Sequence, residues 1–406
     1  MGDIMRHHLP GIGRREWLAS GLGLGLAGPA WTNPAAPGSK VSVARCAEYG
    51  AALYPVMRAM FDQLGGIGGL VKGKTVGIKI NLTGGPRNRV CNVPIERSAY
   101  THPGVVGTAI RLFSEAGAAR IRVLEGCFSC GDPLEEFMYD AGWDPLSLIN
   151  AGNRVEMENT NVLGRGKRYA RRMVPDGGLV FPGFDLNHAY DESDVIVSIA
   201  KMKEHATCGI TLSMKNMFGI TPITIYGDRA GKDEPAIEAL GGRGTVMHLG
   251  AKGPSRSAPQ ELDAKSPRDD RWRVPRIVTD LCGAVPIHLA IVDGIEALAG
   301  GEGSWVSTSR HVKPGLLVAG LNPVATDAVS AALMGFNPLA GHHEPPYEGC
   351  DSTLLLAEEK GLGTRDLSRS EVAGAKIAAA RFDFRSASPG PWMRVRRQSA
   401  GAEPPK

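Results

Sequence analysis

Apolar runs and one-sided helical patterns alternate along most of the chain. Lys74 to Leu82 (KTVGIKINL) and Asp194 to Ala200 (DVIVSIA) are rich in β-branched residues, so each predicts a buried strand. Ala51 to Leu64 places its apolar residues on one helical face, and Pro103 and Gly117 mark the start and end of a second helix. This succession of strand, helix and strand predicts an α/β fold built on a mostly parallel sheet with flanking helices.

Further segments extend this prediction. Asn322 and Pro323 have the residue types of a helix cap and a first helical residue. Residues Gly142 to Gly178 show little periodicity and predict an irregular insertion or a hairpin-rich lobe, while Gly227 to Pro275 predicts a long loop that folds over another part of the protein or is partly mobile. Additional strands are predicted at Val41 to Arg45, Arg120 to Leu124, Leu289 to Asp293 and Gly315 to Gly320.

The N-terminal segment resembles a targeting signal more than a folded element. Arg14 and Arg15 form the paired-arginine pattern of twin-arginine signals. The apolar stretch from Leu18 to Ala27 is too short for a stable membrane span, and small residues allow cleavage after Ala30 or Ala36. We therefore expect a signal and linker at residues 1–36, an α/β domain of one or two lobes at 40–385, and a disordered tail at 386–406.

This division of the chain predicts a protein that the twin-arginine translocation machinery exports already folded, so that the mature form is periplasmic or otherwise extracytoplasmic. Export after folding is useful when a cofactor must be loaded first. The alternative is that the basic leader is a disordered segment without a targeting role.

Composition narrows the possible functions. The chain has 406 residues, of which 43% are hydrophobic and 22% charged, and a formal net charge of +4. Such a small excess of basic residues, with no basic run interleaved with aromatic residues, argues against a nucleic-acid partner. After the N-terminal segment there is no uninterrupted apolar run of the length that a membrane-spanning helix needs, so no transmembrane segment is expected in the mature form.

The densest group of polar residues follows the predicted strand at 194–200. Lys201, Lys203 and Lys215 supply positive charge for a carboxylate or phosphate, and Asn216 adds a polar contact. His205 could transfer a proton near neutral pH, and a desolvated Lys215 could act as a nucleophile or covalent anchor. The alternative is an ordinary solvated loop. Because ligands of parallel sheets bind beyond the carboxyl ends of the strands, we expect contributions from five strand ends: 81–89, 125–130, 201–205, 293–302 and 322–327.

The segment from Asp194 to Pro222 resembles the family known as domain of unknown function 362. Lys74 to Asn81, Thr101 to Gly117 and Ala319 to Gly335 are similar to that family too, so the resemblance covers roughly residues 40–362. It implies an α/β fold and no established biochemical function. Some members carry ferredoxin-type cysteine clusters, and the lack of such clusters in this chain argues against electron transfer.

A more distant resemblance concerns the nickel-pincer lactate racemases. His205 and Lys215 are similar in spacing to the acid/base histidine and the cofactor-bearing lysine of that family, and His102 resembles its opposing acid/base. His248 would correspond to the nickel-ligating histidine, so the resemblance implies a divalent metal or a nickel-pincer-like cofactor. The chain departs from that family at residues 211–214, which are not glycine-rich, and in the long interval before His248.

Two histidines from different strand ends could also perform proton chemistry without this cofactor. His205 and His102 would face each other across a substrate carbon, and Arg87 and Arg89 would help the lysines to hold a carboxylate. For His102 the alternative role is a helix cap, and for His248 an ordinary loop position. The first hypothesis is therefore an enzyme, racemase-like or epimerase-like, that acts on a small anionic substrate. The second is a non-catalytic periplasmic protein that binds an anion or a metal complex.

Cys127 and Cys130 form a single CxxC motif. Two thiols cannot complete a four-thiolate zinc or iron–sulfur site. A local disulfide or plain structural thiols is one interpretation, and a redox role is the other. A redox protein that uses these two cysteines is the third functional hypothesis.

Overall fold

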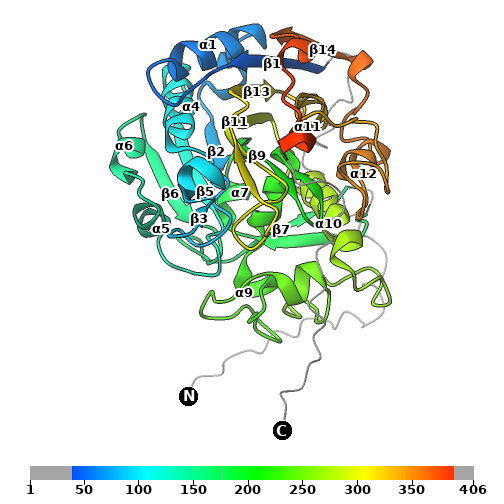
Figure 1. Ribbon diagram of the computed structural model, residues 1–406. Coiled ribbons are helices and arrows are strands. Elements are labelled where there is room, and N and C mark those ends of the chain that lie inside the picture. The colour runs from blue at the N-terminus through cyan, green and yellow to red at the C-terminus, as the bar shows by residue number, and fades with distance from the viewer. Residues whose placement is uncertain (1–38, 176, 388–406) are drawn as a thin grey trace, which may run out of the picture. The chain divides into compact units, whose positions relative to one another are not determined.

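The computed structural model describes residues 39–175 and 177–387, and its centre is a ten-stranded sheet in the order β14-β1-β13-β11-β9-β2-β5-β6 (Figure 1). β10 pairs with β9 and β12 with β11, while β3–β4 and β7–β8 form separate two-stranded sheets. The strands are β1 Ser39–Arg45, β2 Thr75–Lys79, β3 Arg89–Val90, β4 Val93–Pro94, β5 Arg120–Glu125, β6 Val155–Asn159, β7 Ala170–Met173, β8 Gly183–Leu186, β9 Val195–His205, β10 Gly209–Thr211, β11 Leu289–Ala299, β12 Arg310–Val312, β13 Leu316–Gly320 and β14 Ser370–Gly374.

Five neighbouring strands, β11, β9, β2, β5 and β6, run parallel, which confirms the predicted α/β class. β13 runs antiparallel to both β11 and β1. Its carboxyl end therefore lies at the opposite edge of the sheet from the carboxyl ends of the parallel strands. The expectation that residues 322–327 join the other four strand ends is wrong for this reason.

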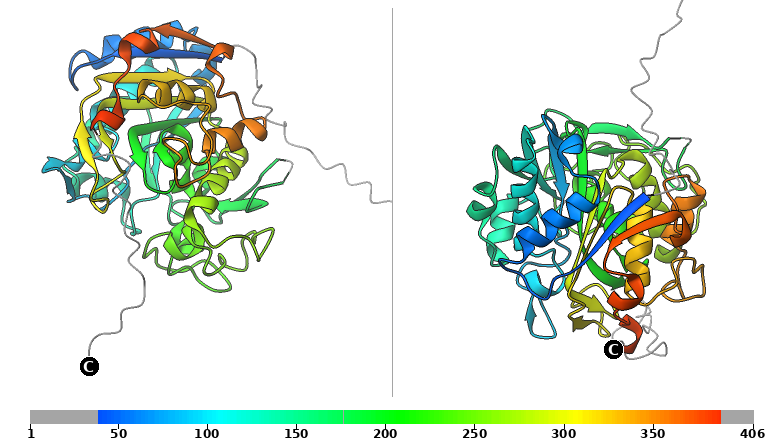
Figure 2. Two further views of the ribbon diagram at one scale, coloured as in Figure 1. Left: turned by 45° about the vertical axis from the view of Figure 1, so that its right-hand side comes forward. Right: turned by 90° about the horizontal axis from the view of Figure 1, so that it is seen from above.

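Helices cover both faces of the sheet (Figure 2). Side chains of α1 and α4 pack with Val197 and Ile199 on one face, whereas α10 and α11 pack with Ile196 and Val292 on the other. The helices are α1 Leu53–Gln63, α2 Gly68–Val71, α3 Ile95–Ser98, α4 Pro103–Glu115, α5 Leu134–Asp140, α6 Pro145–Ile149, α7 His188–Asp191, α8 Ser213–Asn216, η1 Met217–Ile220, α9 Ile223–Tyr226, η2 Gly244–His248, α10 Asp270–Ala284, α11 Pro323–Leu333, α12 Thr353–Glu359, η3 Leu367–Arg369, α13 Ile377–Ala380 and α14 Phe384–Ala387.

Side-chain caps begin several of these helices. Asn322 accepts a hydrogen bond from the Ala325 backbone N–H and is followed by Pro323, as predicted for α11. The His102 side chain accepts from the Gly104 N–H at the start of α4. These caps satisfy backbone donors that the first helical turn leaves unpaired.

Strand β9 is longer than the apolar pattern indicated. The prediction ended it at residue 200 and placed Lys201, Lys203 and His205 in a following loop. Instead the strand continues to His205, and residues 203–205 pair with β10 in a hairpin. The two lysines remain in the strand because each buried ammonium group finds an oxygen partner, Asp293 for Lys201 and the Ala99 carbonyl for Lys203.

Two predicted irregular regions contain regular elements. Residues 142–178, expected to be an insertion or a hairpin-rich lobe, include β6, which extends the main sheet, and β7, which forms a hairpin with β8. Residues 227–275 are mostly irregular, but they contain η2 and the start of α10, and Pro275 lies inside that helix. Within the described segments, no helix is both long and apolar enough to cross a membrane.

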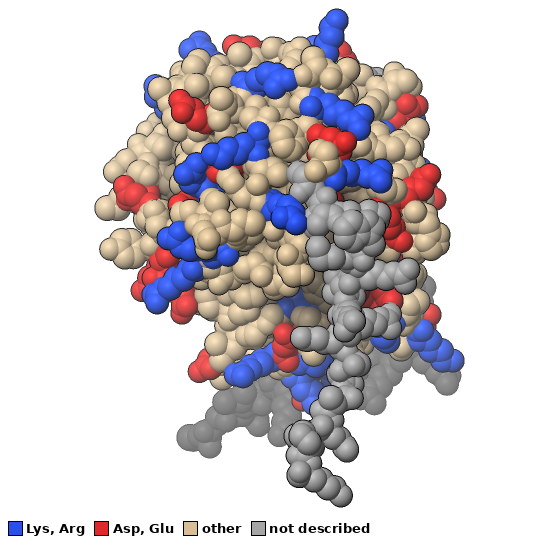
Figure 3. Space-filling model, in the orientation of Figure 1, with Lys and Arg blue, Asp and Glu red and all other residues tan. Residues whose placement is uncertain are grey.

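The proposed signal at residues 1–36 and nearly all of the proposed tail at 386–406 lie outside the described residues. On the molecular face shown in Figure 3, basic and acidic side chains are interspersed and form no continuous basic patch. This mixed surface agrees with the small net charge of the chain.

Candidate functional site

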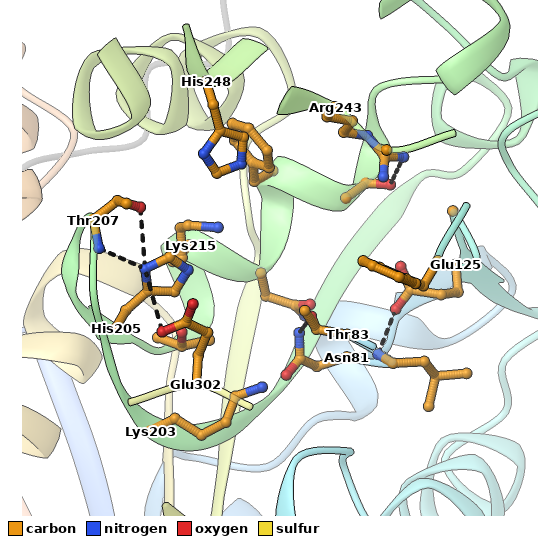
Figure 4. A pocket seen from close by; sticks show the side chains of 18 of the residues that line it. Asn81, Thr83, Glu125, Lys203, His205, Thr207, Lys215, Arg243, His248 and Glu302 are labelled. Atoms are coloured by element: carbon orange, nitrogen blue, oxygen red, sulfur yellow. Dashed lines mark hydrogen bonds and ion pairs between the residues drawn. The ribbon is translucent and has the colours of Figure 1, made fainter. Parts of the chain in front are cut away.

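A cavity of about 300 Å³ lies where the parallel strands β2, β5 and β9 end. Five of the residues singled out in the sequence line it: Lys203, His205, Lys215, Asn216 and His248. Figure 4 shows all of these except Asn216 with labels. Four of the five predicted strand-end segments contribute, since Asn81, Glu125 and Glu302 also reach this cavity. The parallel sheet therefore brings together residues that are more than 200 positions apart in the chain.

His102 does not line this cavity. Its Nδ1 accepts from the Gly104 N–H at 3.0 Å, and its ring stacks on Tyr49 with a centroid distance of 3.6 Å. Its backbone N–H donates to Asp293 Oδ2 at 3.0 Å. Burial lowers the pKa of His102 to about 4. The imidazole therefore has the capping role of the alternative interpretation, and the opposing pair of His102 and His205 is not assembled.

Lys201 lies outside the cavity too. Its Nζ donates to the Tyr49 hydroxyl at 2.7 Å and pairs with Asp293 Oδ2 at 3.2 Å. Arg87 is exposed and pairs with Asp140, and exposed Arg89 donates to the Asn92 carbonyl. Lys201, Arg87 and Arg89 are therefore not among the side chains that line the cavity.

His205 has one ring nitrogen fixed by its own hairpin. Nδ1 lies 3.1 Å from the Thr207 backbone nitrogen, whose N–H it accepts, and 4.0 Å from Glu302 Oε2. Burial lowers the pKa of His205 to about 3, so the ring is neutral at neutral pH. A neutral ring that accepts at Nδ1 carries its proton on Nε2. His205 therefore has one N–H group, at Nε2, that it can donate in a hydrogen bond.

Two lysines add positive charge to the walls. Lys203 Nζ donates to the Ala99 carbonyl at 2.8 Å, and burial lowers its pKa to about 7. Lys215 Nζ lies 4.3 Å from the centre of the Phe218 ring, and burial lowers its pKa as well. An amine with a pKa near 7 exists in both protonation states at physiological pH, which suits Lys203 to proton transfer.

Several lining residues were not singled out as site residues from the sequence. Lys79 Nζ pairs with Glu125 Oε1 at 2.8 Å and donates to Asn216 Oδ1 at 3.0 Å. Burial lowers the pKa of Lys79 and raises that of Glu125, and the ion pair opposes both shifts. A lysine inside an apolar strand requires such a partner, so Lys79 could have been found from the sequence.

Arg243 was missed because it lies in a glycine-rich stretch without a pattern. Its Nε donates to the Thr221 carbonyl at 2.9 Å and its Nη2 to Asn161 Oδ1 at 2.8 Å. These bonds hold the guanidinium plane in place, and burial lowers the pKa of Arg243 to about 10. Among the described lining residues, four basic side chains (Lys79, Lys203, Lys215, Arg243) face two carboxylates (Glu125, Glu302).

Polar atoms without a partner also mark the cavity. Asn81 Oδ1 and Thr211 Oγ1 are buried and lack a hydrogen-bond partner in the described structure. Glu302 accepts from the Ala206 N–H at 2.9 Å and from Trp305 Nε1 at 2.8 Å. Since buried polar atoms are normally paired, a ligand or water is expected to satisfy Asn81 and Thr211.

His248 lines the cavity with its ring against Phe218, at a centroid distance of 5.1 Å. Burial lowers the pKa of His248 to about 4, so the ring is neutral. Across residues 39–175 and 177–387, no group of three or more His, Cys, Asp or Glu side chains is placed to hold a metal ion. Protein ligands for a bare metal ion are therefore not assembled around His248.

Asp327 contributes to the site from the opposite edge of the sheet. Its carboxylate accepts from the backbone N–H groups of Ser213 and Met214, each at 2.9 Å. Burial raises the pKa of Asp327 to about 7. These bonds hold the first turn of α8 and thereby position Lys215 and Asn216, so Asp327 supports the cavity without lining it.

The two cysteines of the CxxC motif lie beside the cavity. Phe128 and Ser129, between them in the chain, line its wall, and the Phe128 ring stacks on Trp305 at 6.1 Å. Both thiols are free; Cys127 is buried and Cys130 is partly exposed.

The fold and the cavity define an α/β protein with a pocket at the carboxyl ends of parallel strands, where basic side chains outnumber acidic ones. The chain belongs to the family described as Domain of unknown function (DUF362), whose model matches residues 76–332. This match confirms the first resemblance described in the sequence.

Two other proteins are similar to this chain. Thylakoid-associated protein sll1697 of Synechocystis is 26% identical over 278 residues, which is 64% of this chain and 79% of that protein. A crystal structure of a Thermotoga maritima protein matches with 13% identity and a TM-score of 0.30 over 66% of this chain. The chain spans only 56% of the length of that solved protein.

The residues fit a nickel-pincer cofactor only in part. Lys215 and His248, which would hold such a group, share the cavity with His205. His102, which the racemase chemistry needs on the other side of the substrate, caps α4 elsewhere. The donor set is therefore incomplete for that chemistry, and the reaction proposed below uses only side chains of this protein.

Proposed function

We propose that the cavity binds a small carboxylate. The single observation that supports this proposal is the excess of basic groups in an enclosed site, where burial strengthens their attraction for an anion. Lys215 and Arg243 are the proposed partners of the carboxylate, because neither forms an ion pair with the two acidic lining residues, as Lys79 does with Glu125. Asn81 and Thr211 would bind the remaining polar atoms of the ligand.

The proposed reaction is removal and return of a proton at the carbon next to the carboxylate or a neighbouring carbonyl, a chemistry of the isomerase class. The neutral amine of Lys203 takes the proton, because its pKa of about 7 leaves much of it unprotonated at neutral pH. The Nε2–H of His205 donates to the oxygen on which negative charge develops. The ammonium group of Lys203 then returns the proton to carbon.

Exchange of the α-hydrogen for deuterium tests this proposal. The protein is incubated in D₂O with a panel of small carboxylates that carry a hydroxyl or keto group, and proton NMR follows the α-hydrogen signal. At least one carboxylate is expected to exchange. The Lys203→Arg variant, which keeps the positive charge but has no neutral amine, should lose exchange by about a hundredfold or more while still binding the carboxylate.

The matched control is Lys265→Arg, because Lys265 is exposed and does not line the cavity. It should exchange like the wild type. If the wild type binds a carboxylate but exchanges no hydrogen, the non-catalytic binding protein is the better description. If no carboxylate binds, the proposed ligand class is wrong.

We also propose that Arg14 and Arg15 direct export of the folded protein. The name of the Synechocystis relative, a thylakoid-associated protein, is compatible with a place at or beyond a membrane. The Arg14→Lys, Arg15→Lys double variant should stay in the cytoplasm, as cell fractionation with immunoblotting would show. Export at the wild-type level by this variant would argue for a leader without a twin-arginine role.

A further inference from the structure

A second hollow borders the cysteine-containing loop. It encloses about 720 Å³, and Cys130 and Phe128 are among its lining residues. Its walls combine apolar side chains, such as exposed Tyr139 and Leu146, with carboxylates. The acidic lining residues are Asp132, Glu135, Glu136, Asp140 and Asp144, and none of the described lining residues is Lys or Arg.

The backbone of the CxxC loop is held by two asparagine side chains. Asn161 Nδ2 donates to the carbonyls of Cys127 and Cys130, at 2.6 Å and 3.0 Å, and Asn159 Nδ2 donates to the Cys130 carbonyl at 3.1 Å. Ser129 has a φ of 60°, which turns the chain back between the two cysteines. These contacts fix the backbone of both cysteines against the same pair of asparagine side chains.

The environments of the two thiols differ. Cys127 is fully buried, and burial raises its pKa well above the ordinary value. Cys130 is partly exposed to the acidic hollow, and the hydrogen bond from Cys127 lowers its pKa. Because the thiolate is the nucleophile, Cys130 is the thiol that is both accessible and activated.

We propose that Cys127 and Cys130 form a thiol–disulfide exchange site whose partner is a disulfide that carries positive charge and docks in the acidic hollow. The Cys130 thiolate attacks one sulfur of the partner disulfide, forms a mixed disulfide, and releases the other sulfur as a thiol after protonation by water. Cys127 then loses its proton to water and attacks Cys130 Sγ, which breaks the mixed disulfide and releases the second partner sulfur as a thiolate that water protonates. The partner disulfide is thereby reduced to two thiols, and the protein dithiol is oxidised to a disulfide.

This order of attack makes opposite predictions for two matched variants. After reaction of the full chain with cystamine, peptide mapping by mass spectrometry should find a Cys127–Cys130 disulfide in the wild type. The Cys127→Ser variant should accumulate a mixed disulfide on Cys130, whereas Cys130→Ser should leave Cys127 unmodified. A wild type without the internal disulfide, or a mixed disulfide on Cys127, would overturn the proposal.

The charge of the hollow is tested with two disulfides of similar size. Cationic cystamine should react with Cys130 about tenfold faster than anionic dithiodipropionate, because the carboxylates concentrate cations. The Glu135→Gln, Glu136→Gln double variant should reduce this preference, and so should high salt. Equal rates for both reagents in the wild type would refute a positively charged partner. None of these measurements depends on the proposed carboxylate reaction.

Discussion

At the scale of single residues, burial determines which groups can do chemistry. Lys203 and His205 lie two positions apart on β9, yet the first retains a proton that it can exchange near neutral pH and the second stays neutral. The difference follows from the ordinary pKa values of the two side chains. Desolvation lowers the high pKa of a lysine into the range near neutral pH, whereas it moves the pKa of a histidine below that range. The same physical effect therefore gives the two residues different roles.

The lowered pKa of Lys203 has a measurable effect on stability. Its pKa is about 7 in the folded protein and 10.5 ordinarily, so between these values the unfolded chain binds more protons. The free energy of unfolding should therefore rise with pH above 7, by at most about 1.4 kcal/mol per pH unit. Urea unfolding at pH 7.0 and 8.5 (about one and a half pH units apart) measures this rise.

The Lys203→Met variant is the control for this measurement. It keeps an unbranched side chain and removes the titrating amine, so its unfolding free energy should lack this part of the rise. If the wild type and the variant show the same pH dependence, Lys203 does not titrate in this window and is not the proposed base.

Several site residues could be predicted from the sequence, and others could not. His205 and Lys215 follow the apolar run at residues 194–200, where polar residues are visible as an interruption of the apolar pattern. Arg243 comes from an irregular stretch, and its place is fixed by carbonyl oxygens of other loops that no local pattern reveals. The prediction that His102 faces His205 failed for a different reason. The local sequence correctly indicated that His102 caps a helix, but it contains no information on which distant residue the side chain lies near.

At the scale of elements, apolar patterns predicted the presence of a strand or helix better than they predicted its direction or its length. β2, β5 and α4 were located to within a few residues because their apolar residues and their Gly or Pro boundaries agree. The same kind of pattern could not show that β13 runs antiparallel, because an apolar run does not indicate the direction of a strand within the sheet. The end of β9 was missed because its lysines resemble a loop until their buried partners are known.

The β9–β10 hairpin depends on a glycine. Gly209 has a φ of +72°, and a Cβ there would lie 2.7 Å from the Pro346 carbonyl oxygen. Gly209→Ala should destabilise the protein by about 3 kcal/mol, from the left-handed backbone and the close contact together. It should also weaken ligand binding, since the hairpin carries His205 and Thr207.

Gly142→Ala is the matched control, because Gly142 has a φ of +84° and a Cβ added there would meet no atom within 4 Å. It should cost about 1 kcal/mol, from the backbone conformation alone. Chemical denaturation of both variants gives the comparison. Equal losses of stability would mean that the contact with Pro346 is relieved without cost.

At the scale of the whole molecule, one sheet joins two apolar cores. Ile196 and Ile199 belong to the same strand, β9, but Ile196 packs with the core on the α10 and α11 side and Ile199 with the core on the α1 and α4 side. Loss of either core would expose one face of β9, so we expect the described domain to unfold as a single cooperative unit.

Two conservative substitutions test this cooperativity. Ile196→Val and Ile199→Val should each lower the unfolding free energy by about 1 kcal/mol, because each removes one buried methylene. Circular dichroism and tryptophan fluorescence should report one shared transition in both variants. Separate transitions, each sensitive to only one of the two substitutions, would indicate that the two faces unfold independently.

The position of β1 has a consequence for synthesis of the protein. β1 pairs with β13 and β14, the last two strands of the described chain, although it is the first of the described strands to leave the ribosome. While translation proceeds, its backbone donors and acceptors on both edges must wait for partners that lie far downstream in the chain. That edge of the sheet can therefore close only after the ribosome has passed residue 374, so it forms later than the parts of the domain whose strands are already complete.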